Sequence, residues 1–397
     1  MNVLSPAEVK LPDGSSTDFA NLDIAATAPC LDVVAAAVSD LLPWYGSVHR
    51  GAGALARRST LAYEQARETV AEHLGCGPGD AVVFTRNTTD ALNLLAHVLP
   101  AGTTVVTFDV EHHANLLPWR SPLRIGVPRS PEQAVAALDE TLSALRGPVL
   151  VAVTAASNVT GELWPVRELA AVAHRHGARI AVDAAQLAPH SPVDLGALGA
   201  DYVAVSGHKL YAPFGAGVLA GRADWLDAAP PYLAGGGATA EVAADFAVRW
   251  HDGPARHEAG TPNLIGAVAL ATALRALAGA DLHAEHRLVA RLRDGIAALP
   301  HVEELRLFAA DAPRVGIVSF AVPGADPDEL STTLGRDHAI GVRTGLFCAH
   351  PLTRRLLREA ADRLGATPPG AALRASVGIG TREEHVDRLL AVLQSRA

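Results

Sequence analysis

The sequence predicts an α/β fold with a mostly parallel sheet and a smaller α/β domain after it. Short β-branched and apolar runs alternate with helical spacing from about residue 80 to residue 220. Such alternation is typical of strand–helix–strand units with right-handed crossovers. Two of these runs lead to Asp183 and Lys209. Since ligands bind at strand ends in α/β sheets, we expect a site there.

Size and charge favour a globular protein of two domains. The chain has 397 residues, of which 49% are apolar and 19% charged, and chains of this length usually contain more than one domain. The net charge of −9 argues against a nucleic-acid partner, because phosphate binding needs basic clusters. The sequence shows neither a secretory signal nor an apolar run of membrane-spanning length, so we expect a cytoplasmic protein.

The cysteine pattern argues against a disulfide framework and against a zinc cluster. Cys30, Cys76 and Cys348 are an odd number without regular spacing or a CxxC pair. The adjacent His112 and His113 do not indicate a metal either, because neighbouring positions rarely face one ion together. An aromatic ring stacked on a flat cofactor is the better functional interpretation for one of these histidines. The structural alternative is a loop histidine with local hydrogen bonds.

The first elements of the chain are predicted to be helical. Residues 32–42 have helical spacing that stops at Pro43, and residues 54–74 form a longer amphipathic pattern closed by Gly75. Residues 51–56 nominally fit a dinucleotide-binding pattern, but no β-type run precedes them, as that fingerprint requires.

The central part of the chain predicts the main sheet. Strands are expected at 81–84, 103–108, 149–154, 178–183 and 202–205, with helices at 91–98 and 165–176. The glycine-rich stretch 215–221 predicts a turn into an antiparallel strand. The last third predicts helices at 262–278, 282–299, 327–334 and 383–393, and strands at 302–308, 315–322 and 374–379.

Thr88 and Thr89 are candidates for binding a phosphate. They follow the strand at 81–84 and precede a helix, and the free N–H groups of a helix N-terminus form an anion site. The structural alternative is that one threonine merely caps the helix. Two adjacent threonines at a strand end slightly favour phosphate.

Asp183 and Lys209 predict pyridoxal phosphate. A lysine in an apolar setting can become a neutral amine and form a Schiff base with a carbonyl. A nearby carboxylate can hold the protonated ring nitrogen of pyridoxal phosphate, which serves as an electron sink in amino-acid chemistry. The two residues lie one strand–connection–strand repeat apart.

Motifs along almost the whole chain resemble the class V aminotransferase group of fold-type I pyridoxal-phosphate enzymes. Within this group they are most similar to the cysteine desulfurases and selenocysteine lyases. The matching segments are 48–51, 87–89, 111–115, 157–159, 182–186, 206–211, 235–237, 258–263, 342–345 and 374–376. The resemblance implies a large domain at 21–265 with a mostly parallel sheet of the seven-stranded type. It implies a small domain formed by 1–20 and 266–397.

The same resemblance implies how the cofactor would be held. Lys209 would form the Schiff base and remove the Cα proton, Asp183 would pair with the ring nitrogen, and His113 would stack on the ring. Gln186 would hydrogen-bond the ring hydroxyl. The phosphate would be bound by residues of two strand ends and of the partner subunit in a homodimer: Thr88, Thr89, Ser206 and His208, with Thr261 from the partner.

The residues that the resemblance implies for substrate binding lie before and after Cys348 in the sequence. Asn158, Arg343 and Arg374 would bind the substrate, with Arg374 forking onto the α-carboxylate. In the desulfurases a cysteine after the Arg-Thr-Gly segment attacks the substrate sulfur, and Cys348 has that position. The alternative is a small buried apolar residue. The desulfurases often carry histidines just before this cysteine, whereas this chain has Leu346 and Phe347.

The function implied is conversion of L-cysteine to L-alanine, with the sulfur held as a persulfide on Cys348 and passed to an acceptor protein. One alternative is a C–S lyase, epimerase or aminotransferase of the same group that acts on another amino acid in secondary metabolism. A second is a catalytically silent binding protein of this fold, which the joint presence of Lys209, Asp183, His113 and Arg374 disfavours.

Overall fold

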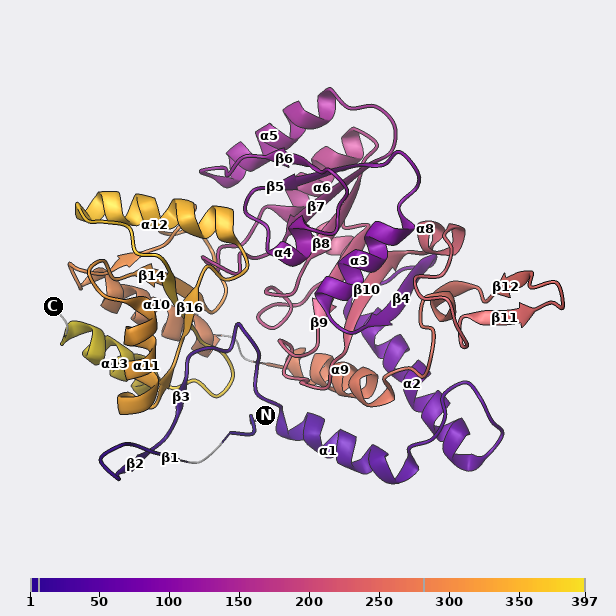
Figure 1. Cartoon of the computed structure of the whole chain (residues 1–397), viewed down its shortest axis with the longest axis horizontal. Helices are drawn as coiled ribbons and strands as arrows, with labels where there is room; N and C mark the ends of the chain where they lie inside the picture. Colours follow the sequence, from indigo (N-terminus) through magenta and orange to yellow (C-terminus); the bar gives the residue numbers. More distant parts are fainter. Residues whose placement is uncertain (1, 6–7, 281–282, 396–397) are drawn as a thin grey trace.

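A seven-stranded sheet forms the centre of the large domain in the computed structural model, which describes residues 2–5, 8–280 and 283–395 (Figure 1). In spatial order its strands are β4 (Asp80–Thr85), β10 (Gly217–Arg222), β9 (Tyr202–Ser206), β8 (Arg179–Asp183), β7 (Val149–Thr154), β5 (Thr104–Phe108) and β6 (Leu123–Ile125). The five strands from β9 to β6 pair in parallel, and β10 is antiparallel to both β9 and β4. The predicted α/β class with a mostly parallel sheet is confirmed.

Both faces of this sheet are buried, which explains why its strands are nearly continuous apolar runs. Val151 and Val153 face a core with the helices α2, α5, α6 and α9, while Leu150 and Ala152 face a second core with α3 and α8. The helices of the large domain are α1 (Asp32–Leu41), α2 (Ala54–His73), α3 (Thr88–Val98), α4 (His113–Leu116), α5 (Pro131–Ser143), α6 (Val166–Arg175), α7 (Leu195–Leu198), α8 (Ala223–Ala228) and α9 (Leu264–Leu277), with short 3₁₀ turns at Leu42–Trp44 and Gly253–Arg256.

The small domain is built on an antiparallel sheet of four strands. In spatial order they are β13 (Glu303–Glu304), β14 (Ile317–Ala321), β17 (Ala372–Ser376) and β16 (Arg343–Gly345). Its helices are α10 (His283–Ala297), α11 (Pro327–His338), α12 (His350–Leu364) and α13 (Glu383–Gln394). The N-terminal segment joins this domain, because β3 (Ala20–Asn21) pairs with β15 (Ile340–Gly341). Within the same segment, β1 (Val9–Lys10) pairs with β2 (Ser16–Thr17).

Helix α9 packs against elements of the large domain. Ala269 and Ala273 of α9 pack with α1, and Leu270 lies in the core shared with α2. From these contacts we propose a domain boundary near residue 280, whereas the resemblance implies 265. Helix α12 also contributes Leu352 and Leu356 to the large-domain core, so the two domains share a continuous apolar contact.

Several elements differ from their predicted bounds. The run 302–308 forms only the two-residue strand β13, because the N–H groups of Leu307 and Phe308 donate to the buried carboxylate of Glu162 and not to a neighbouring strand. The last strand lies at 372–376, not at 374–379. The predicted helix at 282–299 is α10, and Leu282 lies outside the described residues. The sequence did not indicate β6, α5 or α12.

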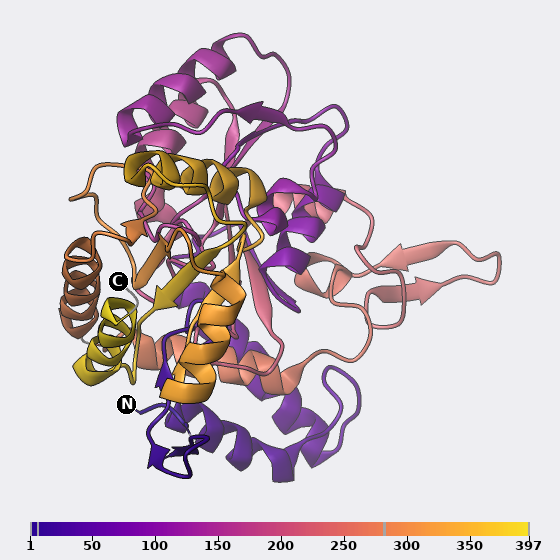
Figure 2. The same cartoon turned by 60° about the vertical axis from the view of Figure 1, so that its left-hand side comes forward.

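A hairpin of β11 (Thr239–Val242) and β12 (Val248–Trp250) protrudes from the large domain in both views (Figures 1 and 2). Phe246 lies in its turn with 85% of its surface exposed. No helix of the described chain is both long and apolar enough to cross a bilayer.

Candidate functional site

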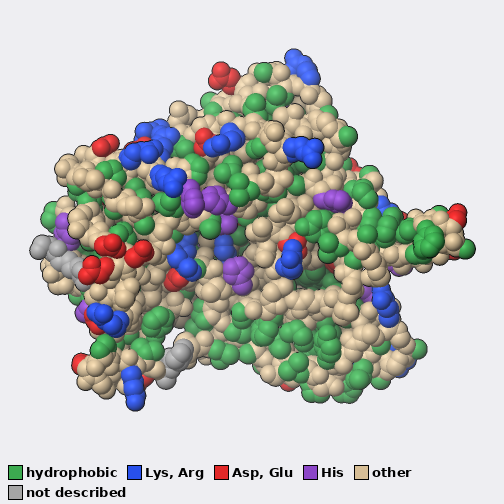
Figure 3. All heavy atoms as spheres, in the orientation of Figure 1, with side chains coloured by type: hydrophobic (Ala, Val, Ile, Leu, Met, Phe, Trp, Pro, Cys, Tyr) green, Lys and Arg blue, Asp and Glu red, His purple; other side chains and the backbone are tan. Residues whose placement is uncertain are grey.

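A cavity of about 550 Å³ lies between the carboxyl ends of the parallel strands and the small domain. Figure 3 shows basic and histidine side chains around a hollow in the middle of the molecular face. All but two of the predicted site residues line this cavity; the exceptions are His113 and Thr261.

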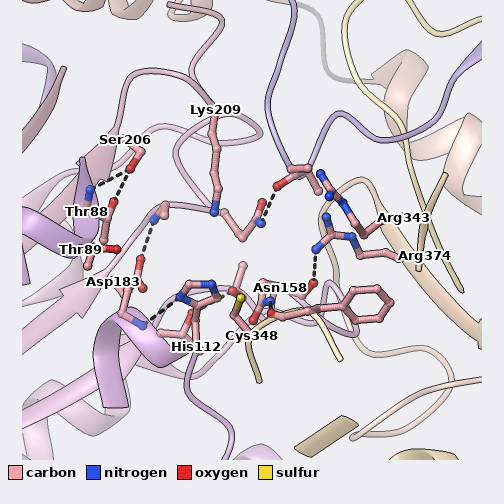
Figure 4. A pocket seen from close by; sticks show the side chains of 18 of the residues that line it. Thr88, Thr89, His112, Asn158, Asp183, Ser206, Lys209, Arg343, Cys348 and Arg374 are labelled. Atoms are coloured by element: carbon pink, nitrogen blue, oxygen red, sulfur yellow. Dashed lines mark hydrogen bonds between the residues drawn. The ribbon is translucent and has the colours of Figure 1, made fainter. Parts of the chain in front are cut away.

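Asp183 and Lys209 reach the same cavity from neighbouring strands (Figure 4). Asp183 ends β8, and Lys209 follows the end of β9. Burial lowers the pKa of Lys209 to about 8, although the charge of Asp183 opposes this shift. Burial also raises the pKa of the Asp183 carboxyl, which the charge of Lys209 opposes. Each charge thus affects the pKa of the other group, and both side chains line one cavity.

The N-terminus of α3 provides an anion-binding end to the cavity. Thr88 donates its backbone N–H to Ser206 Oγ at 2.8 Å, and the two hydroxyl oxygens lie 2.8 Å apart. Asn87 caps the helix by accepting from the N–H of Asp90 at 3.0 Å. Thr89 and His208 also line this end. Hydroxyl groups and the helix dipole together favour a phosphate here.

His112, and not His113, reaches the cavity. The backbone N–H of Ala114 donates to His112 Nδ1 at 3.0 Å and fixes the orientation of the ring. Burial lowers the pKa of His112 to about 3, and the charge of Lys209 adds to this effect. His113 instead packs its ring edge-on against that of His350, with centroids 4.5 Å apart. Since α4 begins at residue 113, the two side chains leave the chain in different directions.

Gln186 contains a buried acceptor without a partner among the described residues. Its Nε2 donates to the carbonyl of Ala25 at 3.0 Å, whereas its Oε1 is buried and unpaired. Asp183 Oδ1 accepts from the N–H of Ala185 at 2.9 Å. A cofactor with a ring hydroxyl, a basic ring nitrogen and a phosphate would satisfy Gln186, Asp183 and the α3 end together. The residues therefore fit pyridoxal phosphate.

Arg374 forms the other end of the cavity and is 4% exposed. Its Nη1 donates to the carbonyl of Asn158 at 2.9 Å, and its Nε is buried without a partner among the described residues. Burial lowers its pKa to about 10, and Asp23 opposes that shift. Arg343 is exposed and forms an ion pair of 3.0 Å with Asp23. Asp23 was not identified from the sequence, because it lies more than 300 positions from both arginines.

Cys348 lines the same cavity and is exposed. This exposure is what a nucleophilic thiol needs, and it differs from the buried position expected for a structural cysteine. Arg343, Arg374 and Cys348 all come from the small domain, while Lys209 and Asp183 come from the large domain. The site therefore depends on how the two domains are packed.

Comparison with known proteins agrees with this geometry. The Aminotransferase class-V family matches residues 20–389. A cysteine desulfurase of Klebsiella pneumoniae is 36% identical over 393 residues, covering 95% of this chain and 93% of the relative. A probable cysteine desulfurase of Mycolicibacterium paratuberculosis is 38% identical over 80% of this chain, which spans only 48% of that relative.

The fold is also found in solved structures. A cysteine desulfurase from Thermococcus onnurineus, solved in its apo form, superposes with a TM-score of 0.83 at 32% sequence identity. The superposition covers 98% of this chain and 99% of that structure. With a family match across nearly the whole chain and a cavity built for its cofactor, this chain belongs to the class V aminotransferase family of pyridoxal-phosphate-dependent enzymes.

Proposed function

We propose that this protein is a cysteine desulfurase that converts L-cysteine to L-alanine and holds the released sulfur as a persulfide on Cys348. The observation that carries the proposal is the exposed thiol of Cys348 in the wall of the cavity that also contains Lys209, Asp183 and Arg374. The names of the relatives support the same activity.

Pyridoxal phosphate, when bound, supplies an electron sink that stabilises negative charge at the substrate Cα. We assign Asp183 to the ring nitrogen, Gln186 to the ring hydroxyl, and the α3 N-terminus with Ser206 to the phosphate. We assign the stacking role to His112, because its ring lines the cavity and stays neutral. A neutral imidazole adds no repulsion against a protonated ring.

Lys209 then acts as the base that takes the Cα proton. A pKa of about 8 leaves a useful neutral fraction of this amine near neutral pH. Arg374 binds the α-carboxylate of the substrate through charge-assisted hydrogen bonds. Asn158 lies next to Arg374 and helps to orient the same end of the substrate.

Cys348 takes the sulfur as a thiolate. A new S–S bond forms between Cys348 Sγ and the substrate sulfur while the substrate C–S bond breaks, and the electron pair of that bond stays with the substrate carbon. That carbon then takes up a proton, Lys209 returns a proton to Cα, and alanine leaves. No external oxidant is needed for this step. An acceptor thiol, which we expect on a partner protein in the cytoplasm, removes the sulfur from the persulfide.

A product assay with L-cysteine tests the proposal. We expect the protein with bound pyridoxal phosphate to form alanine, and to release sulfide when a thiol reductant is added. Formation of pyruvate and ammonia would instead indicate a β-lyase, and formation of D-cysteine an epimerase. A requirement for a keto acid would indicate an aminotransferase.

We also propose a homodimer in which Thr261 of the partner subunit completes the phosphate end. Thr261 is exposed and does not line the cavity of its own chain, and its neighbours Gly260 and Pro262 border a second cavity of about 440 Å³ with Arg50. The exposed Trp44 adds apolar surface for association. Mixing inactive K209A and T261A protomers should restore activity, because one site of each mixed dimer is then intact. A monomer of full activity in sedimentation would rule out the dimer.

A further inference from the structure

Two hydrogen bonds hold the backbone of the Cys348 turn against the large domain. Asn158 Nδ2 donates to the carbonyl of Phe347 at 2.7 Å, and the backbone N–H of His113 donates to the carbonyl of Cys348 at 2.7 Å. Asn158 follows β7, and His113 begins α4. The turn itself connects β16 with α12 of the small domain. These contacts therefore join the two sides of the cavity beside the thiol. Figure 4 shows Asn158 and Cys348 next to each other in the cavity.

The turn has an unfavourable backbone conformation. Phe347 and Cys348 both lie in the left-handed region, with φ of 50° and 51°. Residues other than glycine seldom adopt this conformation, and two in succession persist only where surrounding contacts fix them. The Phe347 side chain supplies one such contact, because it packs into the large-domain core. The amide of Asn158 supplies another, from a residue that is itself 7% exposed.

Asn158 also contacts the group that binds the substrate carboxylate. Its carbonyl accepts from Arg374 Nη1 at 2.9 Å, and the guanidinium of Arg374 lies over the Phe347 ring at 5.1 Å from the centroid. Through its carbonyl and its side-chain amide, one residue therefore contacts both Arg374 and the turn that carries the thiol.

We propose that Asn158 is a positioning residue for Cys348, in addition to its contact with the substrate. Its side-chain amide keeps the strained turn in the conformation that presents the thiol to the cavity, at a fixed position relative to Arg374. This role in sulfur transfer rests on the proposed desulfurase function. The effect of the Asn158 amide on the conformation of the turn does not depend on that function. Loss of the amide donor should let the turn relax and move the thiol away from the substrate sulfur.

The variants N158D and N158A test this proposal against the matched control S157A. Aspartate keeps the size of asparagine but removes the donor to Phe347. Ser157 accepts from the N–H groups of Val159 and Thr160 in the same loop, without contacting the Cys348 turn. A purely structural role for the loop would give all three variants similar effects.

The first measurement is the rate at which iodoacetamide alkylates Cys348 in the protein with bound cofactor. Peptide mass spectrometry quantifies the alkylated cysteine over time. We expect N158D and N158A to increase this rate several-fold and S157A to leave it within about twofold of the unmodified protein. Cys30 and Cys76 of the same samples report any general loosening of the structure. An unchanged rate for Cys348 in both Asn158 variants would overturn the proposal, whatever the activity of the protein.

The second measurement separates positioning of the thiol from binding of the substrate. Exchange of the Cα hydrogen of L-alanine in D₂O needs Lys209 and the cofactor, but not Cys348. At saturating substrate we expect N158D to lower kcat for sulfur release by at least about 10-fold, as a misplaced reacting group does, and to lower kcat for exchange by less than about threefold. Equal losses of kcat in both reactions would show that Asn158 orients the substrate and not the thiol, and would overturn the proposal. If the unmodified protein exchanged alanine but formed no alanine from cysteine, the desulfurase proposal would fail, and the alkylation result would still stand.

Discussion

The two sides of the cavity are built in different ways. The large-domain side, formed by Thr88, Asp183 and Lys209, consists of residues at the ends of neighbouring strands and at the start of one helix. The small-domain side, formed by Cys348 and Arg374, comes from a strained turn and from a strand of a second sheet. The first side is held by the hydrogen bonds of one sheet. The second side belongs to the small domain, and its position relative to the first depends on contacts between the domains.

This difference suggests a division of labour. The sheet fixes the groups that the cofactor needs, which are an amine, an acid and an anion-binding end. The domain contact decides which substrate group meets the thiol. Loss of Lys209 on the large-domain side should therefore stop all chemistry, whereas loss of Cys348 on the small-domain side should stop sulfur transfer alone.

The largest expected effect is that of K209A. Loss of the base should reduce both alanine formation from cysteine and Cα hydrogen exchange by about 10³-fold or more. The chain contains only two lysines, Lys10 and Lys209, and Lys10 is exposed in β1. The matched control K10R should therefore retain full activity. Borohydride reduction of the protein with bound cofactor should attach the label to the peptide containing Lys209. Attachment to Lys10 would contradict the assignment.

The second-largest effect is expected for C348A, which should impair sulfur release but not the chemistry at Cα. We expect C348A to lower sulfur release from cysteine by more than about 100-fold, because the remaining groups bind substrate but offer no acceptor for its sulfur. Exchange of the alanine Cα hydrogen should stay within about threefold. C76A is the control, since Cys76 lies outside the cavity. If C348A still moved sulfur from cysteine to an acceptor thiol at the original rate, Cys348 would not be the nucleophile.

The third prediction concerns pH. Only the neutral amine of Lys209 adds to the cofactor carbonyl. With a pKa of about 8, the rate of pyridoxal-phosphate uptake by the apoenzyme should rise about tenfold per pH unit below pH 8 and level off above it. The charge of Asp183 raises the pKa of Lys209, so D183N should move this midpoint to lower pH. Stopped-flow absorbance measures the uptake, and an unmoved midpoint would show that the two groups do not interact.

The smallest effect should distinguish the paired histidines. Removing a stacked ring costs about 0.5–1.5 kcal/mol, so H112A should weaken pyridoxal-phosphate binding by roughly 2- to 10-fold. H113A should leave the affinity nearly unchanged, because His113 does not line the cavity and its ring packs on that of His350. Titration of the apoenzyme with the cofactor measures both. The reverse order of effects would return the stacking role to His113.

The sequence alone determined the α/β class and most residues of the cofactor side. Lys209, Asp183 and Thr88 could be identified because each follows a strand whose apolar run is visible in the sequence, and parallel strands bring their carboxyl ends to one edge. That geometry is local and repeated, so spacing along the chain is enough to predict it.

Only the tertiary structure decided the remaining features. It brought Asp23 to Arg374 and Arg343, packed α9 against α1, placed His112 instead of His113 in the cavity wall, and connected Asn158 to the Cys348 turn. These contacts join residues 189 and more positions apart, or depend on the direction in which a side chain leaves a helix start. Neither follows from the pattern of the sequence, because both are set by how the two domains pack.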